Sequence, residues 1–161
     1  MGKAGREIVG KSADETIKLL NKALADEWLA YYQYWVGAQV VSGKMRPEIE
    51  DELKEHADEE KKHAEMLAKR IVQLGGKPIL EFSDLIKQAN CGYDAPKNPS
   101  TAAIVAQNIQ GERCAIAIYS SILKKLKGSD DYITFNLVRK ILEDEVEHEE
   151  DLENLAEDLK G

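Results

Sequence analysis

Apolar residues recur at steps of three and four in four long stretches of the chain, which is the spacing of one face of an α-helix. The stretches predict helices over residues 12–43, 46–74, 100–127 and 129–160. The first and last pairs have short connections, whereas residues 77–99 form a long one with a short helical candidate at 83–89. This order predicts a single all-α domain over residues 1–161, a four-helix bundle with one long crossover and no fifth helix.

Local signals set the expected helix ends. Residues 1–11 are small, polar and mildly basic, so we predict a mobile tail. Ser12 with Glu15 predicts a capping box at the start of the first helix. Pro47 suits the first turn of the second helix, and Ser129 is the predicted cap of the fourth.

Six side chains of the types that bind metals interrupt the predicted apolar stripes. They are Glu27, Glu60, His63, Glu112, Glu145 and His148. The spacing Glu-x-x-His occurs twice, and on a helix it places both side chains on one face. An unpaired buried charge costs several kcal/mol, and no Lys or Arg lies on these stripes nearby. Two divalent cations would balance four carboxylates, so we predict a dinuclear metal site, with a metal-free polar core as the alternative.

The two halves of the chain repeat this chemistry. Glu27 and Glu60 are 33 residues apart, as are Glu112 and Glu145. A tyrosine follows each first glutamate by seven residues, Tyr34 after Glu27 and Tyr119 after Glu112, and taken alone each would be a plain core aromatic. Two helical hairpins related by a pseudo-two-fold axis are expected, each giving half of one site. The oxygen-rich ligand set suits iron or manganese.

The composition narrows the classes of function. The chain has 30 acidic and 22 basic residues, a formal charge of −8. Such a surface repels nucleic acid and attracts cations, although solubility alone also explains it. No apolar run is long enough for a membrane span and no signal peptide is seen, so a cytoplasmic location is expected. Two cysteines are too few for a disulfide framework or a zinc ribbon.

Taken together, the ligand pattern and the long crossover resemble the ferritin-like di-iron proteins, a pattern described in general for that family. The segment from Glu27 to Tyr34 is similar to the ferroxidase helix of bacterioferritin. The resemblance implies that Glu60 and Glu145 bridge two irons. It also implies that Glu27 and Glu112 are terminal ligands, that His63 and His148 cap one iron each, and that Tyr34 and Tyr119 hydrogen-bond to ligands.

Departures from bacterioferritin refine the comparison. Bacterioferritin binds haem through a Met that here is Lys61, so no haem is expected by that route. The missing fifth helix points to a twelve-subunit cage of the Dps type. With its two cysteines, the chain resembles the Dps-like subgroup called thioferritins. That resemblance implies a redox-active thiol pair, Cys91 and Cys114, near the metal site. Cys114 lies about 200° around the helix from Glu112, facing the crossover. Inert buried cysteines are the alternative.

The resemblance implies a ferroxidase that oxidises Fe²⁺ with hydrogen peroxide or oxygen and stores Fe³⁺ in a homo-oligomeric cage, protecting against oxidative stress. A rubrerythrin-like peroxidase or a manganese catalase that stores nothing is the second hypothesis. The third hypothesis is a DNA-binding Dps-type protein that acts through Lys3, Arg6 and Lys11 of the tail. So few positive charges make this hypothesis weak. His56 either lines an iron entry path or binds a transient third iron, or it is a polar residue near the bundle end.

Overall fold

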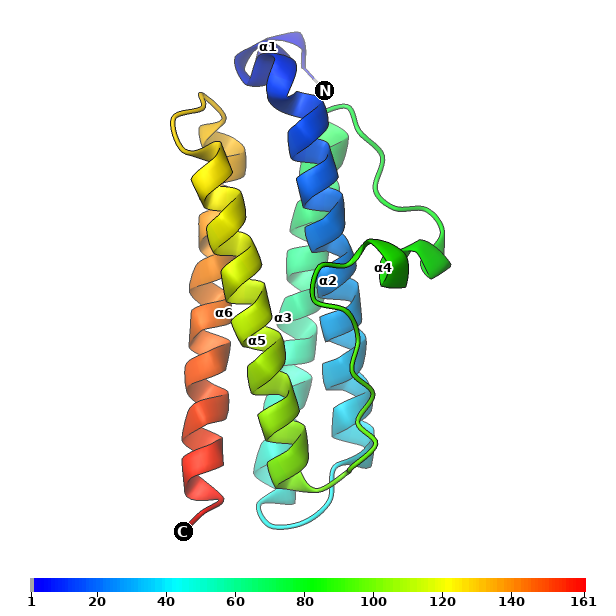
Figure 1. Cartoon of the computed structure of the whole chain (residues 1–161), viewed down its shortest axis with the longest axis vertical. Coiled ribbons are helices and arrows are strands. Elements are labelled where there is room, and N and C mark those ends of the chain that lie inside the picture. Colours follow the sequence, from blue (N-terminus) through cyan, green and yellow to red (C-terminus); the bar gives the residue numbers. More distant parts are fainter. Residues whose placement is uncertain (1) are drawn as a thin grey trace.

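The computed structural model describes residues 2–161, with all side chains except those of Lys3, Arg6 and Lys11. Four long helices stand side by side as a bundle (Figure 1). They are α2 (Ala13–Val40), α3 (Arg46–Gln73), α5 (Thr101–Leu126) and α6 (Tyr132–Asp158). Within the described range there is no strand, only an isolated bridge between Ser42 and Ser100. The predicted all-α bundle is confirmed.

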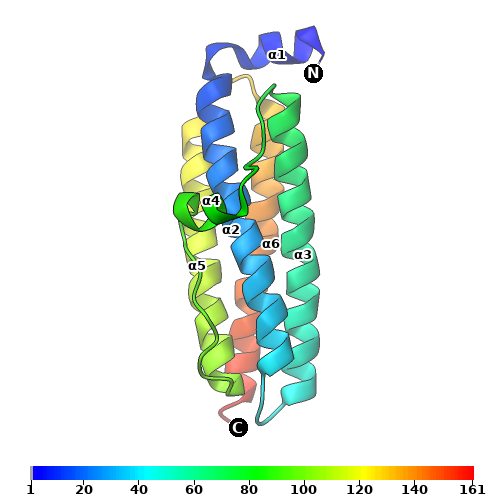
Figure 2. The same cartoon turned by 90° about the vertical axis from the view of Figure 1, so that its right-hand side faces the viewer.

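The connections give the bundle its topology. Short loops join α2 to α3 and α5 to α6, so each pair runs antiparallel (Figure 1). The crossover between α3 and α5 carries the short helix α4 (Phe82–Gln88) and descends from one end of the bundle to the other beside α2 and α5 (Figure 2). This is the long crossover with a short helix that the sequence predicts.

The N-terminal segment differs from the mobile tail that we predicted. It forms a short helix, α1 (Lys3–Val9), followed by a 3₁₀ turn, η1 (Gly10–Ser12). Val9 is buried and joins the apolar cluster at this end of the bundle. Burial of this side chain offsets part of the entropy lost on ordering the segment.

Two predicted caps are wrong. The backbone of Ser12 is already helical, and its hydroxyl donates 2.8 Å back to the carbonyl of Val9 instead of accepting from the first turn of α2. At α6 the cap is Asp131 rather than Ser129, because the chain turns two residues further before the helix begins. The Asp131 carboxylate accepts from the backbone N–H of Thr134 at 3.0 Å.

Asp131 also pairs with a buried arginine. Arg70, near the end of α3, donates from Nη2 to Asp131 at 2.7 Å and from Nε to the Thr134 hydroxyl at 2.8 Å. The three side chains are each less than one tenth exposed. Paired charges of this kind tolerate burial, and here they fix the start of α6 against α3.

Apolar packing divides into two clusters along the bundle axis. One cluster includes Leu20, Leu67 and Ile141, near α1. The other includes Leu53 and Ile104, near the opposite end. On every long helix, the predicted ligands fall between the two clusters, so the apolar core surrounds a polar layer at mid-height.

Candidate metal centre

The polar layer brings together one glutamate of α2, one of α5, and a Glu-x-x-His pair from each of α3 and α6. Two groups result, in each of which the ligand atoms lie within 4.8 Å of one another. The groups are Glu27, Glu60, His63 and Glu145, and Glu60, Glu112, Glu145 and His148. Because Glu60 and Glu145 belong to both groups, the two sequence motifs form halves of one centre.

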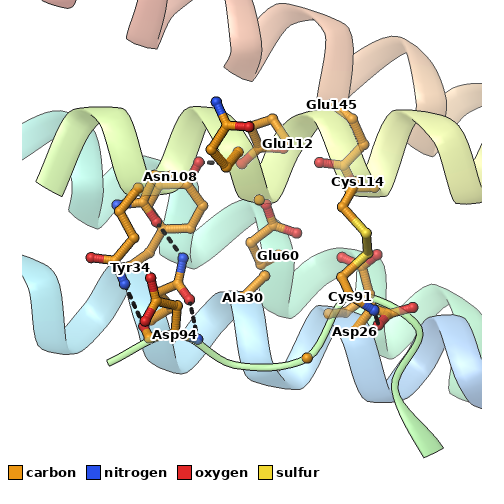
Figure 3. A pocket seen from close by; sticks show the side chains of 17 residues that line it. Asp26, Ala30, Tyr34, Glu60, Cys91, Asp94, Asn108, Glu112, Cys114 and Glu145 are labelled. Atoms are coloured by element: carbon orange, nitrogen blue, oxygen red, sulfur yellow. Dashed lines mark hydrogen bonds between the residues drawn. A yellow bond between two sulfur atoms is a disulfide. The ribbon is translucent and has the colours of Figure 1, made fainter. Parts of the chain in front are cut away.

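Both imidazoles direct Nδ1 toward the carboxylates. His63 Nδ1 lies 3.3 Å from Glu27 Oε2 and 3.3 Å from Glu145 Oε1. His148 Nδ1 lies 3.3 Å from Glu60 Oε1 and 3.4 Å from Glu145 Oε2. The two ring centroids are 6.0 Å apart. Figure 3 shows Glu60 and Glu145 reaching toward the same space from their helices.

The ligand atoms of the six side chains are arranged to bind cations rather than to hydrogen-bond to one another. All six side chains are at most 3% exposed. Several of their atoms are buried without a hydrogen-bond partner in the described chain, namely Glu27 Oε2, Glu60 Oε1, His63 Nδ1, both Glu145 oxygens and His148 Nδ1. Buried polar atoms in native proteins are nearly always satisfied. Two divalent cations would satisfy these atoms and neutralise four carboxylates.

The shifted pKa values of these side chains also reflect the crowding of buried carboxylates. Burial raises the pKa of Glu27 and Glu112 well above its usual range, and the charges of Glu60 and Glu145 raise it further. Burial also favours the neutral acid at Glu60, but the close contacts with His148, His63 and Glu27 together outweigh it, so its pKa is lowered. Burial lowers the pKa of His148, yet Glu145 and Glu60 raise it to about 12. The raised pKa values of Glu27, Glu112 and His148 favour their protonated forms in the absence of metal.

Two tyrosines connect the hairpins across the centre. Tyr34 of α2 donates its hydroxyl to Glu112 of α5, and Tyr119 of α5 donates to Glu27 of α2. Both tyrosines are 1% exposed. Each hydrogen bond occupies one carboxylate oxygen and leaves the other to face the centre, which orients the terminal glutamates.

Two further acids were not predicted from the sequence. Asp144 Oδ2 lies 3.3 Å from His63 Nε2, and Glu59 Oε2 lies 2.8 Å from His148 Nε2. A carboxylate on the outer nitrogen fixes an imidazole with its other nitrogen toward a metal. A signal existed, because each acid directly precedes a Glu-x-x-His motif, but both helices are so rich in acids that it did not stand out.

A disulfide lies beside the centre. Cys91 of the crossover and Cys114 of α5 are bonded, with Cα atoms 5.8 Å apart. They line a cavity of about 210 Å³ that also contacts Glu27, Glu60 and Glu112. In Figure 3 the disulfide closes one end of this cavity.

The crossover is also held by an acid that the sequence did not single out. Asp26 accepts hydrogen bonds from the backbone N–H groups of Asn90 and Cys91, at 2.7 and 2.8 Å, and from the Asn90 side chain at 2.6 Å. It directly precedes Glu27, so one helix turn anchors both the crossover and the centre.

Comparison with known families agrees with this geometry. Residues 17–161 match the family described as the ferritin-like domain. The chain belongs to this ferritin-like family. The fold class and the relationship to bacterioferritin-related, Dps-like proteins that the sequence predicts are confirmed.

Individual relatives match more than nine tenths of this ferritin-like chain and at least 80% of their own length. The DNA protection during starvation protein of Pyrococcus furiosus is 34% identical, with 92% of this chain and 80% of that protein covered. The structure of a dodecameric thioferritin, the bacterioferritin-related protein of Bacteroides fragilis, has 41% identity and a TM-score of 0.95, covering 99% and 95%. The bacterioferritin of Desulfovibrio desulfuricans, described with a diiron site, has 28% identity and a TM-score of 0.80, covering 99% and 85%.

His56 adjoins the ferritin-like centre without belonging to either ligand group. Its ring stacks on that of His148, with centroids 4.1 Å apart, and meets the Tyr34 ring edge-on at 5.2 Å. Burial, with the neighbouring charge of His148, lowers its pKa to about 3. The imidazole is therefore neutral and deep in the bundle. The two interpretations of the sequence, a residue that serves iron entry and a polar residue near the bundle end, both stay predictions.

None of the described helices is both long and apolar enough to cross a membrane.

Proposed function

We propose that this protein is a ferroxidase that binds two Fe²⁺ ions between its four helices and oxidises them. One observation carries the proposal: two buried ligand groups share Glu60 and Glu145 and hold donor atoms that have no hydrogen-bond partner among the described residues. Relationship to a bacterioferritin with a diiron site supports iron as the metal. Oxygen-rich ligand sets also accept manganese, so metal content belongs among the tests.

The residues would divide the work as follows. Glu60 and Glu145 would bridge the two ions, since each is common to both groups. Glu27 with His63 would complete one ion's ligands, and Glu112 with His148 those of the other. The tyrosines and the two acids behind the imidazoles would keep these ligands in place.

The reaction takes one electron from each ion. Two Fe²⁺, one hydrogen peroxide and two protons give two Fe³⁺ and two water molecules, so peroxide is consumed without releasing a hydroxyl radical. The cavity beneath the crossover contacts Glu27, Glu60 and Glu112 and gives the oxidant a place beside the substrate ions. Molecular oxygen is the other oxidant that this site could use.

Cys91 and Cys114 would exchange electrons with the centre. In the reduced state, the two thiols could return two electrons to two Fe³⁺, giving two Fe²⁺, the disulfide and two protons. Their place on the wall of the same cavity supports this role. If neither Cys91→Ser nor Cys114→Ser changes peroxide-dependent turnover over repeated cycles, the cysteines are structural only.

We further propose that the chain assembles into a dodecameric cage that stores the oxidised iron. The relative from Bacteroides fragilis, described as dodecameric, matches nearly the whole chain. Mass measurement of the particle tests the assembly. Iron content after loading separates storage from a discrete peroxidase or catalase, because storage exceeds two ions per subunit.

The proposed activity is tested by mixing the metal-free assembly with Fe²⁺ under nitrogen and then adding hydrogen peroxide in stopped flow. Fast formation of Fe³⁺ that saturates at two ions per subunit is expected. Oxidation no faster than that of Fe²⁺ in buffer would reject the ferroxidase.

A further inference from the structure

The two halves of the chain match around the dinuclear centre. An offset of 85 residues converts each ligand of the first half into one of the second, namely Glu27 into Glu112, Glu60 into Glu145 and His63 into His148. The same offset relates Glu59 to Asp144, the two acids behind the imidazoles. Ligands and outer acids that match in this way would give two equal positions for the ions.

The two outer acids nevertheless differ in how closely they approach the imidazoles. Glu59 Oε2 lies 2.8 Å from His148 Nε2, whereas Asp144 Oδ2 lies 3.3 Å from His63 Nε2. Hydrogen bonds between nitrogen and oxygen are usually about 2.7–3.2 Å long. The contact behind His148 is therefore a strong hydrogen bond, and the contact behind His63 is a weak one.

A lysine distinguishes the two acids. Lys140 lies one helical turn before Asp144 on α6 and donates from Nζ to Asp144 Oδ1 at 2.5 Å. At the 85-residue offset, its counterpart on α3 is Glu55, which carries the opposite charge. Lys62 Nζ lies 4.0 Å from Glu59 Oε1, too far for a hydrogen bond. Asp144 thus divides its charge between an ammonium group and an imidazole, whereas no ammonium group among the described residues hydrogen-bonds to Glu59.

This competition weakens one imidazole as a metal ligand. A carboxylate behind an imidazole fixes the direction of the ring and raises its basicity toward the metal. Because Lys140 draws on the Asp144 carboxylate, His63 receives less of this support. The ammonium group also repels a cation bound beside that ring, although Lys140 is 56% exposed and water screens its charge. Both effects disfavour an ion beside His63.

We propose that Lys140 is a positioning residue that makes the two metal positions unequal. The position formed with Glu112 and His148 binds its ion more tightly than the position formed with Glu27 and His63. This role rests on the proposed function, because Lys140 acts on the same dinuclear centre. The first Fe²⁺ to bind would occupy the position beside His148, and the ion beside His63 would be the more readily exchanged.

The occupancy of each position tests this order of binding. The metal-free assembly is loaded with one Co²⁺ per subunit and crystallised without oxidant, and anomalous scattering gives the amount of metal at each position. We expect about tenfold more metal beside His148 than beside His63, at the lower end of the effect of an outer partner on affinity. Equal occupancies, or more metal beside His63, would overturn the role of Lys140.

Four variants separate the lysine from other causes of inequality. Lys140→Met should bring the two occupancies close to equality, whereas Lys140→Arg keeps the cation and should preserve the difference. Glu55→Lys places a lysine one turn before Glu59 and should lower the occupancy beside His148. Lys61→Met removes an exposed charge of α3 and is the control, which should change nothing. An unchanged ratio in Lys140→Met would show that the lysine does not set the order.

The same crystals distinguish the role of Lys140 from the ferroxidase itself. Metal in equal amounts at both positions would reject the role of the lysine and leave the dinuclear centre intact. Absence of Co²⁺ from both positions would reject the centre, and the role of Lys140 with it.

Discussion

The hydroxyl of Tyr34 donates a hydrogen bond to Glu112 on the opposite hairpin, and the hydroxyl of Tyr119 donates an equivalent hydrogen bond to Glu27. The hairpins are thus joined at the carboxylates themselves and not only by apolar contacts on either side. The Glu-x-x-His motifs of α3 and α6 form a single centre because α2 and α5 each contribute one glutamate. The tyrosine of each of these two helices also holds the glutamate of the other helix.

Replacing either tyrosine by phenylalanine should therefore loosen one terminal ligand. A buried carboxylate oxygen loses its donor, which costs about 1–3 kcal/mol, and metal affinity should fall about 10–100-fold. Titration of Tyr34→Phe and Tyr119→Phe with Co²⁺ checks this. Tyr132→Phe, at an exposed tyrosine of α6, is the control. Affinity equal to that of the unaltered protein in both variants would make the tyrosines plain core aromatics.

The acids behind the imidazoles should matter about as much. Asp144→Asn or Glu59→Gln removes the carboxylate that holds His63 or His148 by Nε2, so we expect metal affinity about 10–100-fold lower. Glu147→Gln, exposed on α6 between Glu145 and His148, is the matched control. An equal effect of all three substitutions would mean that net charge, rather than imidazole orientation, sets the affinity.

The buried ion pair at the start of α6 should dominate the stability of that end of the bundle. Arg70→Met leaves Asp131 buried without its cation, and we expect a loss of about 3–5 kcal/mol in the free energy of unfolding. Arg113→Met breaks the exposed contacts with Glu149 and Glu153 and should cost less than about 1 kcal/mol. Chemical denaturation of both variants measures the difference, and equal losses would refute it.

Two of the attachments of the crossover, the disulfide and the hydrogen bonds to Asp26, should be separable. The disulfide joins residues 23 apart, so Cys114→Ser should cost about 3 kcal/mol through the entropy of the closed loop. The amides of Asn90 and Cys91 should nevertheless stay protected from hydrogen exchange, because Asp26 still accepts from them. Asp26→Ala should remove that protection with the disulfide intact. Loss of protection in Cys114→Ser alone would show that the disulfide does the holding.

The fold could be predicted because its information is local and periodic. The stripes of apolar residues fixed four helices, and Glu-x-x-His at one helical turn placed each pair on a buried face. The equal 33-residue spacings related the two halves. What the sequence could not supply was contact between elements that no period relates, such as the hydrogen bonds by which Asp26 holds the crossover.

The local errors have the same cause. Ser12 and Ser129 fit capping rules, but the preceding 3₁₀ turn and the contact of Asp131 with Arg70 decide where α2 and α6 begin. Val9 orders a segment of mostly small and polar residues by joining the core. Asp144 and Glu59 each precede a Glu-x-x-His motif, but that signal did not stand out among the many acids around them.

The shared ligands test the central claim most directly. Glu60→Ala and Glu145→Ala each remove one residue from both ligand groups, with Glu147→Ala as the control. Circular dichroism should show folded helices in all three. We expect the rate of peroxide-driven oxidation of Fe²⁺ to fall by more than about 100-fold in the first two variants. This is a larger loss than removal of a residue that only hydrogen-bonds to a ligand would cause. Binding of both ions should be lost as well. Retention of one intact Co²⁺ site or of the normal oxidation rate in these variants would contradict a single centre built on Glu60 and Glu145.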